Sequence, residues 1–327
     1  MPTHRHHTTL GLLLAACTPE PPHAPPSPPD APEPVLSDAI EPMRVVSYNA
    51  LCPPCDPAYD PWAVRLDAFA DLVSRYDPDL IGLQELFSPS DVDDWLGLLP
   101  GFEALVFEPE PDGIAWPDPA LLWRASRFEL LEHRHFWMSP TPDEPYSSRG
   151  GHIPRLGIWA RLLERPSGRE IIFFSTHFDA NSPNQTWSAP LTLHELQAVA
   201  DTPQILTGDF NSTPTSDAYR LLTGGLTTFP YPDLPAPWAD ALGQTPWIDA
   251  FDLAANPRTV DADGDAVPSD ARPGWWTPER RIDHIFVAGP GVFEVTEHLT
   301  DVSTYPPNDL PPSDHPWVFA EIAWRVD

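Results

Sequence analysis

The sequence predicts a single α+β domain in which two packed β-sheets are flanked by helices. Three observations lead to this fold class. Many short apolar and β-branched runs are spread over about 280 residues, and few stretches show the periodicity of an amphipathic helix. No second proline-rich linker divides this part of the chain. Strands that outnumber long helices within one uninterrupted domain favour packed sheets covered by helices.

The first element is a strand that begins near Met43 in "MRVVSYNA", and the last is "WVFAEIAWRV" at the C-terminal end. After the first strand, the strand candidates are 79–86, 103–108, 120–124, 128–137, 156–164, 170–177, 203–208, 282–288, 292–299 and, at the C-terminal end, 317–325. A helix is expected at 62–76, where Trp62, Leu66, Phe69, Val73 and Tyr76 share one face, so it should lie across a sheet. Other helices are expected at 89–99, 190–200 and 216–223.

The N-terminal segment has a different composition from the rest. Residues 1–16 contain Arg5, three histidines and the apolar run 10–16, which is typical of a secretory signal. The "LAAC" that ends at Cys17 resembles the bacterial lipobox, in which the cysteine carries a lipid, and the alternative is a partly apolar N-terminus of a soluble protein. Residues 17–42, with nine prolines between 19 and 34, indicate an extended tether before a domain at 43–327. The protein is therefore expected to be exported and anchored by lipid to a bacterial membrane or cell surface, with no protein partner indicated.

The charge is strongly acidic. Lys and Arg total 18 against 48 Asp and Glu, the formal net charge is −30, and every basic residue is Arg. Passive attraction to DNA or anionic lipid is disfavoured. A phosphate substrate is still compatible with this negative charge, because a bound divalent cation can make the local electrostatic potential of an acidic cleft positive.

Cys52 and Cys55 form "CPPC" directly after the first strand. In an exported protein this pair is expected to be a local disulfide or two free thiols. A redox motif would begin a helix, whereas Pro53 and Pro54 begin a loop, and a zinc site would need a second pair of ligands. A structural role is favoured.

Polar side chains are found where several apolar strands are expected to end. These segments are "VVSYN" with Asn49, "DLIGLQE" with Glu85, "IIFFSTHFD" with His177 and Asp179, "QILTGDFN" with Asp209 and Asn211, "RIDHIF" with Asp283, and "PPSDHPW" with Asp314 and His315. One such residue is most often a cap or a solvated loop residue. Six such strand ends on one edge of packed sheets are expected to bring their polar side chains to one crevice.

This set of side chains fits hydrolysis of phosphate esters. Carboxylates bind hard cations such as Mg²⁺, amides and imidazoles hold phosphate oxygens, and a His with a carboxylate partner orients a nucleophilic water. No Ser or Cys stands in a nucleophile-elbow context, so direct attack by water is favoured over a covalent intermediate.

The order SYN, LQE, STH, GDFN, RIDHIF and SDH resembles the endonuclease/exonuclease/phosphatase superfamily, which includes deoxyribonuclease I-like and sphingomyelinase-like enzymes. "TGDFNSTP" and "PPSDHPW" are the most specific segments, and "FWMSPTP" with "PRLGIWARL" is similar to its secreted bacterial branch. The resemblance covers nearly all of Met43 to Arg325. It implies a four-layered α/β/β/α sandwich with the site at one end of the sheets.

The resemblance also implies a role for each residue. Glu85 would bind the catalytic Mg²⁺ (Mn²⁺ being the alternative), with Asn49 beside metal and phosphate and Asp314 completing the metal environment. His177 would donate to the scissile phosphate, and Asp209 and Asn211 would orient the water and a phosphate oxygen. Asp283 would hold His315, which acts as base or as transition-state stabiliser, and the choice of base between Asp209 and His315 stays open. Substrate contacts are expected from Asn49, Arg155 and Asp179.

Two loops bear on the ligands. The stretch after "THFD" has no Lys or Arg, so Arg149 and Arg155 are the expected cationic contacts, and extended contacts to a polyanion are expected to be few. Residues 261–270, "DADGDAVPSD", suggest a Ca²⁺ loop, but they lack Gly at the sixth position and have Arg272 where an EF-hand has its closing Glu. A solvated acidic loop is favoured there.

The leading hypothesis is a Mg²⁺-dependent phosphodiesterase or phosphatase, nuclease-like as the first expectation. A sphingomyelinase-like or other lipid phosphodiesterase is the main alternative, because the protein is expected to sit on a membrane. A non-catalytic binding lipoprotein is the alternative from another class, although no site residue is missing.

Overall fold

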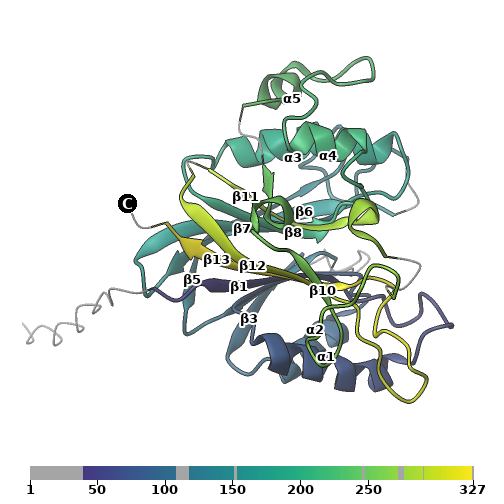
Figure 1. The fold of residues 1–327 in the computed structure, drawn as a ribbon. Helices are drawn as coiled ribbons and strands as arrows, with labels where there is room; N and C mark the ends of the chain where they lie inside the picture. Colours follow the sequence, from purple (N-terminus) through teal and green to yellow (C-terminus); the bar gives the residue numbers. More distant parts are fainter. Residues whose placement is uncertain are drawn as a thin grey trace, which may run out of the picture. The chain divides into compact units, whose positions relative to one another are not determined.

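A computed structural model describes residues 40–107, 118–150, 153–244, 247–271, 276–289 and 291–325 (Figure 1). The predicted signal segment, Cys17 and almost all of the predicted tether lie outside these residues. No helix in these ranges is both long and apolar enough to cross a bilayer.

The described chain forms two mixed β-sheets. One has the strand order β10-β12-β13-β1-β2-β4-β3 and the other β5-β6-β7-β8-β11-β9. The strands are β1 (Met43–Asn49), β2 (Leu80–Gln84), β3 (Phe102–Val106), β4 (Ala120–Arg124), β5 (Phe128–Trp137), β6 (Leu156–Glu164), β7 (Arg169–His177), β8 (Gln204–Asp209), β9 (Ile248–Asp249), β10 (Arg258–Val260), β11 (Asp283–Ala288), β12 (Phe293–Asp301) and β13 (Trp317–Trp324).

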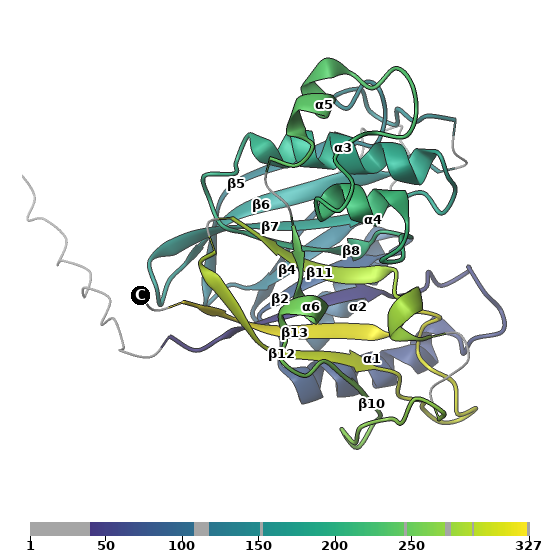
Figure 2. The ribbon, with the colours of Figure 1, turned by 45° about the horizontal axis from the view of Figure 1, so that its top comes forward.

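Helices cover the outer face of each sheet. The seven-stranded sheet packs against α1 (Trp62–Tyr76) and α2 (Pro89–Leu98), through a cluster that contains Phe69 and Trp95. The six-stranded sheet packs against α3 (Asn184–Gln197), α4 (Asp217–Leu222) and α5 (Ala236–Ala241). Figure 2 shows the layers from a second side, with the short α6 (Ala250–Leu253) near β11. The predicted four-layered α/β/β/α sandwich in one domain is confirmed.

Alternation along the central strands separates the two faces of each sheet. Met43 and Val45 of β1 belong to the core between the sheets, whereas Val46 and Tyr48 pack under α1 and α2. In β7, Phe173 faces the other sheet and Phe174 faces the helices. Because both faces are covered, the central residues of these strands form short apolar runs, as the sequence indicates.

Strand direction brings the polar residues to one edge. β1 pairs parallel with β2 and β7 parallel with β8, so the last residues of these four strands lie at the same end of the sandwich. β11 runs antiparallel to β8 and places Asp283 opposite Asp209, and β13 runs antiparallel to β1. The prediction that Asp283 and the "SDH" residues follow strands was therefore wrong. They begin or precede strands, and antiparallel pairing brings them to the same edge.

The element predictions differ from the structure mainly in short or irregular parts. α1 begins and ends as predicted. The helix expected at 190–200 begins at Asn184, so Pro190 lies inside it. An interior proline removes one helical hydrogen bond, but Trp187, Ala189 and Leu191 are buried against the sheet and offset that loss. The elements α5, α6, β9 and β10 were not predicted, because each has six residues or fewer and little periodicity.

Candidate active site

Asp209, the last residue of β8, is the centre of the polar edge. Its Oδ2 lies 3.1 Å from the Asn49 Nδ2, 3.3 Å from the His177 Nε2 and 3.7 Å from the His315 Nε2. Burial raises the pKa of Asp209, but His315 and His177 outweigh burial, and the pKa is held below the usual value of an aspartate. This carboxylate is therefore ionised at neutral pH and faces two imidazoles.

His315 is held by Asp283. Its Nδ1 lies 2.8 Å from Asp283 Oδ2 and 3.0 Å from Asp283 Oδ1, so the carboxylate fixes the ring and leaves Nε2 facing Asp209. Burial lowers the pKa of His315, but Asp283 and Asp209 raise it well above the ordinary value of an imidazole. Burial in turn raises the pKa of Asp283. The predicted His315–Asp283 contact is present in the structure.

His177 has a second carboxylate partner that was not predicted. Asp118, just before β4, places Oδ2 3.1 Å from the His177 Nδ1, and Arg155 Nη1 lies 2.8 Å from the same nitrogen. Arg155 also donates to Asp118 Oδ2 at 3.2 Å. Burial raises the pKa of Asp118, and His177 and Arg155 more than compensate, so that the pKa is lowered. Because β4 is antiparallel to β2, a polar residue before β4 lies at the edge where β2 ends, and this signal could have identified Asp118.

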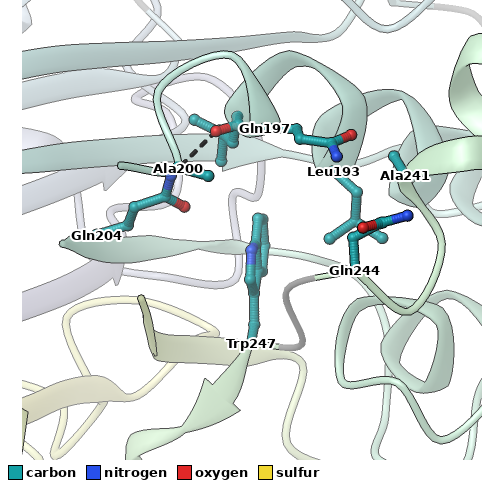
Figure 3. Close-up of a pocket in the computed structure, with 8 residues that line it drawn as sticks. Leu193, Gln197, Ala200, Gln204, Ala241, Gln244 and Trp247 are labelled. Carbon is teal, nitrogen blue, oxygen red and sulfur yellow. Dashed lines mark hydrogen bonds between the residues drawn. The ribbon is translucent and has the colours of Figure 1, made fainter. Parts of the chain in front are cut away.

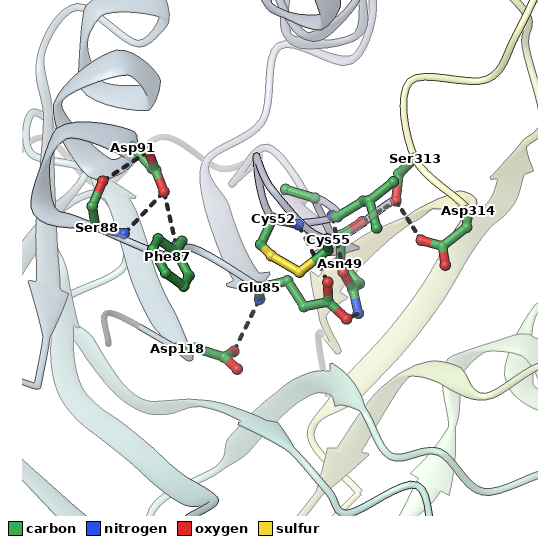
Figure 4. The surroundings of a disulfide bond; sticks show 12 residues. Asn49, Cys52, Cys55, Glu85, Phe87, Ser88, Asp91, Asp118, Ser313 and Asp314 are labelled. Atoms are coloured by element: carbon green, nitrogen blue, oxygen red, sulfur yellow. Dashed lines mark hydrogen bonds between the residues drawn. A yellow bond between two sulfur atoms is a disulfide. The ribbon is translucent and has the colours of Figure 1, made fainter. Parts of the chain in front are cut away.

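Glu85 and Asn49 form the other side of the site. Asn49 Nδ2 donates to Glu85 Oε1 at 3.0 Å, and the Cys52 backbone N–H donates to Glu85 Oε2 at 3.2 Å (Figure 4). Asn49 Oδ1 accepts from the Leu51 N–H at 3.0 Å, so the amide turns its nitrogen, not its oxygen, toward the carboxylates. Glu85 N–H donates to Asp118 Oδ1 at 3.0 Å, which ties this side to His177.

The carboxylates at this edge suit a hard divalent cation. The pKa of Asp314 is above the usual value of an aspartate. Burial raises it most, and the nearby carboxylate of Glu85 raises it further, while His315 acts in the opposite direction. Like charges that approach in this way are relieved by a cation with oxygen ligands. As a separate group, ligand atoms of Asp209, Asp283 and His315 lie within 4.8 Å of one another. The carboxylates present therefore fit a divalent cation with oxygen ligands.

Arg65 of α1 is a buried charge beside this group and was not predicted. Only 4% of the residue is exposed, and its Nη1 donates to the carbonyls of Ala50 at 2.7 Å and Pro312 at 3.0 Å. Arg65 thus joins the end of β1 to the loop that carries Asp314. A charge three residues after Trp62, on the apolar side of the helix, was the signal in the sequence.

The remaining predicted residues lie around the same edge. Asn211 has a left-handed backbone (φ 49°), its N–H donates to Asp209 Oδ1 at 2.8 Å, and its Nδ2 donates to the Phe178 carbonyl. Asp179 accepts from Asn184 Nδ2 at 3.1 Å and lines a small pocket together with Arg149 and Arg155. Arg149 stacks on Trp187, 3.6 Å from the ring centroid.

Two loops singled out in the sequence have structural explanations. Cys52 and Cys55 form a disulfide, the first of the two predicted states, so their sulfurs are not metal ligands. In the loop 261–270, Asp261 Oδ1 accepts from the N–H groups of Asp263 and Asp265. That contact explains one carboxylate of the loop as a turn-forming group, and the preference for a solvated acidic loop over a Ca²⁺ site stays a prediction.

A separate pocket lies between α3, α5 and β8, and its lining includes Leu193, Gln204 and Trp247 (Figure 3). Gln204 donates there to the Leu196 carbonyl at 3.0 Å. None of the polar edge residues lines this pocket, so it is separate from the candidate site.

Comparisons with known proteins agree with the fold and the order of motifs. An endonuclease/exonuclease/phosphatase family protein from Bacteroides thetaiotaomicron is 25% identical, covers 87% of this chain and 98% of its own, and superposes with a TM-score of 0.69. The mannosyl-6-phosphatase Bt3783 of the same organism is 25% identical, with 86% and 100% coverage and a TM-score of 0.69. The human Nocturnin catalytic domain with bound sulfate, at 20% identity, 87% and 94% coverage and a TM-score of 0.61, shares the fold.

The Arabidopsis thaliana "Carbon catabolite repressor protein 4 homolog 3" is 26% identical over 209 residues, which are 57% of this chain and 44% of that protein. This chain thus spans less than half of the length of that relative. The sequence profile of the endonuclease/exonuclease/phosphatase family matches residues 46–315, from β1 to His315. That range includes every predicted site residue of the folded domain, and the chain belongs to the endonuclease/exonuclease/phosphatase family of phosphoester hydrolases.

Proposed function

We propose that the protein is a Mg²⁺-dependent phosphoesterase that hydrolyses phosphate esters by in-line attack of water. The observation that carries the proposal is the arrangement around Asp209, whose ionised carboxylate faces both His177 and His315. Two imidazoles beside one carboxylate supply both hydrogen-bond donors for a phosphoryl group and an acceptor that can orient a water.

Glu85 and Asp314 would hold the Mg²⁺, and Asn49 would keep the Glu85 carboxylate in place through its amide nitrogen. Bound there, the cation would polarise a phosphate oxygen and offset the negative charge of the site. His177 and His315 donate through Nε2 to the phosphoryl oxygens, and Asn211 contributes its amide. Asp118 and Asp283 orient the two rings from behind.

The pKa directions favour Asp209 over His315 as the group that takes the proton from water. The pKa of Asp209 is lowered, so its carboxylate is ionised and can act as an acceptor, whereas the pKa of His315 is raised and the ring carries its proton. A protonated His315 suits a hydrogen-bond donor to the charge that develops in the transition state.

The side chains around the site favour compact phosphate esters over long nucleic acid. Among the described residues, Arg149 and Arg155 are the arginines that line the small pocket beside Asp179, and a polyanionic strand would require a longer row of cations. The likeness to a mannosyl-6-phosphatase at 25% identity supports a sugar phosphate or similar small ester. Cleavage of short nucleic acids, the first expectation from the sequence, is the second candidate, because the family profile includes nucleases.

A bilayer lipid is less favoured as substrate. The large apolar side chains that are exposed in the described part of the chain are Val64 on α1, Phe87 between β2 and α2, Leu131 on β5 and Ile248 on β9. An apolar hairpin that could enter a membrane is not found in those ranges. We propose that the lipid at Cys17 anchors the protein outside the cytoplasm and that the substrate is soluble.

The test is a panel of esters hydrolysed by the full chain with Mg²⁺, Mn²⁺ or EDTA: p-nitrophenyl phosphate, bis-(p-nitrophenyl) phosphate, mannose 6-phosphate, plasmid DNA and sphingomyelin. Metal-dependent hydrolysis of the small esters, faster than that of DNA or sphingomyelin, supports the proposal. No metal-dependent hydrolysis of any of them would favour a non-catalytic binding protein.

A further inference from the structure

The Cys52–Cys55 disulfide closes a turn that directly follows β1. Cys55 N–H donates to the Cys52 carbonyl at 3.0 Å. Cys52 is buried, and Cys55 is exposed. The cross-link therefore joins a fixed position next to the site to a position that solvent reaches.

This turn supports the carboxylate of Glu85. The Cys52 N–H donates to Glu85 Oε2 at 3.2 Å, while Asn49 Nδ2 holds Oε1 at 3.0 Å (Figure 4). Both carboxylate oxygens are thus held by the short segment 49–52. Leu51 has a left-handed backbone (φ 51°), which is unfavourable for leucine and needs support from its surroundings.

The same segment has an independent support on its N-terminal side. Ala50 N–H donates to the Gln84 carbonyl at 3.0 Å, and the Ala50 carbonyl accepts from Arg65 at 2.7 Å. Loss of the disulfide should therefore leave the end of β1 in place and release mainly Leu51 and Cys52. The hydrogen bond that this movement of Leu51 and Cys52 would break first is the one from the Cys52 N–H to Glu85 Oε2.

We propose that the Cys52–Cys55 disulfide positions Glu85 for metal binding, so that the oxidised protein binds the divalent cation more tightly than the reduced protein. This inference rests on the proposed function. In the reduction, a dithiol gives two electrons and two protons, the S–S bond breaks, two cysteine thiols form and the dithiol becomes a disulfide. Because Cys55 is the exposed residue of the pair, we expect the reductant to approach the bond from its side.

The experiment compares Mn²⁺ binding by the full chain carrying Cys17→Ser, so that only Cys52 and Cys55 respond to redox. The oxidised protein, the same protein reduced by a dithiol and then freed of it, and a Cys52→Ser/Cys55→Ser version are titrated with Mn²⁺, and free Mn²⁺ is measured by electron paramagnetic resonance. We expect the dissociation constant to rise about tenfold in both forms that lack the disulfide, as for loss of a partner of a metal ligand. Circular dichroism should show that the reduced form stays folded.

A Glu85→Gln background provides the matched control. In that background, removal of the disulfide should leave the residual Mn²⁺ affinity unchanged, because the carboxylate that it positions is gone. Equal Mn²⁺ affinity of oxidised and reduced protein, even with lower thermal stability, would overturn the inference and leave the proposed function standing. No Mn²⁺ binding by the oxidised protein would overturn both.

Discussion

At the scale of single residues, the chemistry of the site depends on which groups share a carboxylate. One oxygen of Asp209 lies close to Asn49, His177 and His315, while its other oxygen accepts a hydrogen bond from the Asn211 N–H. Asp118 and Asp283 each stand behind one imidazole. Substitution of Asp209 should therefore lower turnover directly. Substitution of Asp118 or Asp283 should act through the orientation of the imidazole that each contacts.

The first prediction concerns the centre. Asp209→Asn or His315→Ala should lower kcat by a factor of about 100 or more, because each removes a group that handles a proton or stabilises charge in the transition state. Hydrolysis of bis-(p-nitrophenyl) phosphate at saturating Mg²⁺ measures this. His133→Ala, at an exposed position on β5, is the control and should keep full activity. Near-normal turnover of either site variant would exclude the assigned role.

The second prediction concerns Asp118, which accepts from the Glu85 N–H at 3.0 Å and contacts both His177 and Arg155. Asp118→Asn should weaken Mn²⁺ binding and lower kcat, each by about tenfold or more, because one substitution disturbs both the proposed metal ligand and the proposed phosphate donor. Calorimetric titration with Mn²⁺ and steady-state kinetics give the two readouts. A variant with normal Mn²⁺ affinity would show that Asp118 does not position Glu85.

The third prediction concerns the pH dependence of stability. The pKa of His298 on β12 is lowered to about 4, mainly by burial. Asp249 raises this pKa, and Arg281 and His284 lower it. The folded state resists protonation of this ring, whereas the unfolded chain takes up the proton below pH 6.5. As the pH falls from about 6.5 to 4, His298 should therefore cost the folded state roughly 3 kcal/mol.

Replacement of His298 by Phe should remove that loss. Urea unfolding at pH 7 and pH 4.5 would compare the two proteins, and the difference between the two pH values should be smaller in His298→Phe. The same difference in both proteins would show that other groups cause the acid sensitivity.

Site residues were predictable from sequence where a motif stood beside an apolar strand. Asn49, Glu85, His177, Asp209, Asp283 and His315 meet at one edge as expected, because strand direction determines where their side chains lie. Asp118 and Arg65 were missed. Asp118 is part of a pairing that depends on the antiparallel direction of β4, and Arg65 is buried by contacts with loops distant in sequence.

At the scale of elements, close approach of the two sheets sets the geometry of the site. Gly82 of β2 faces β8, and a Cβ there would lie 2.0 Å from Thr207 Oγ1 and 3.0 Å from Ser175 Oγ. Gln84 Nε2 donates to Ser175 Oγ across the same interface at 3.0 Å. A larger residue at position 82 would push apart β2, which Glu85 follows directly, and β8, which ends at Asp209.

The fourth prediction follows from this packing. Gly82→Ala should lower the free energy of unfolding by about 1–3 kcal/mol, since a methyl group is forced into a filled interface. Gly97→Ala in α2 is the matched control: nothing lies within 4 Å of a Cβ there, and the substitution should stabilise the protein by about 0.5–1 kcal/mol. Chemical denaturation of both variants checks the pair. A neutral Gly82→Ala would mean that the sheets tolerate separation at this position.

Helix predictions succeeded where one apolar face was long. α1 was predictable because Trp62, Phe69 and Tyr76 repeat on one side over 15 residues. The start of α3 was not, because its stability comes from burial of several faces between the sheet and α4 and α5, which overrides the proline at position 190. The start of α3 at Asn184 therefore depends on tertiary packing, and no local sequence pattern predicts it.

At the scale of the whole molecule, the net charge of −30 opposes binding of a polyanion. The fifth prediction is that a rise in ionic strength from about 0.01 M to 0.15 M speeds hydrolysis of plasmid DNA relative to that of bis-(p-nitrophenyl) phosphate, because salt screens the repulsion. Paired assays at the two ionic strengths measure the ratio. A DNA rate that falls steeply with salt would indicate a cationic DNA surface and contradict the preference for small esters.

The most direct test of the central claim is hydrolysis of bis-(p-nitrophenyl) phosphate and p-nitrophenyl phosphate by the full chain as EDTA and then Mg²⁺ are added. The proposed function places a metal on Glu85 and Asp314, beside the ionised carboxylate of Asp209. Activity should therefore disappear with EDTA and return when Mg²⁺ exceeds the chelator, and Asp209→Asn should stay at least about 100-fold less active under all conditions. Hydrolysis that continues unchanged in EDTA, or that Asp209→Asn retains, would contradict the account.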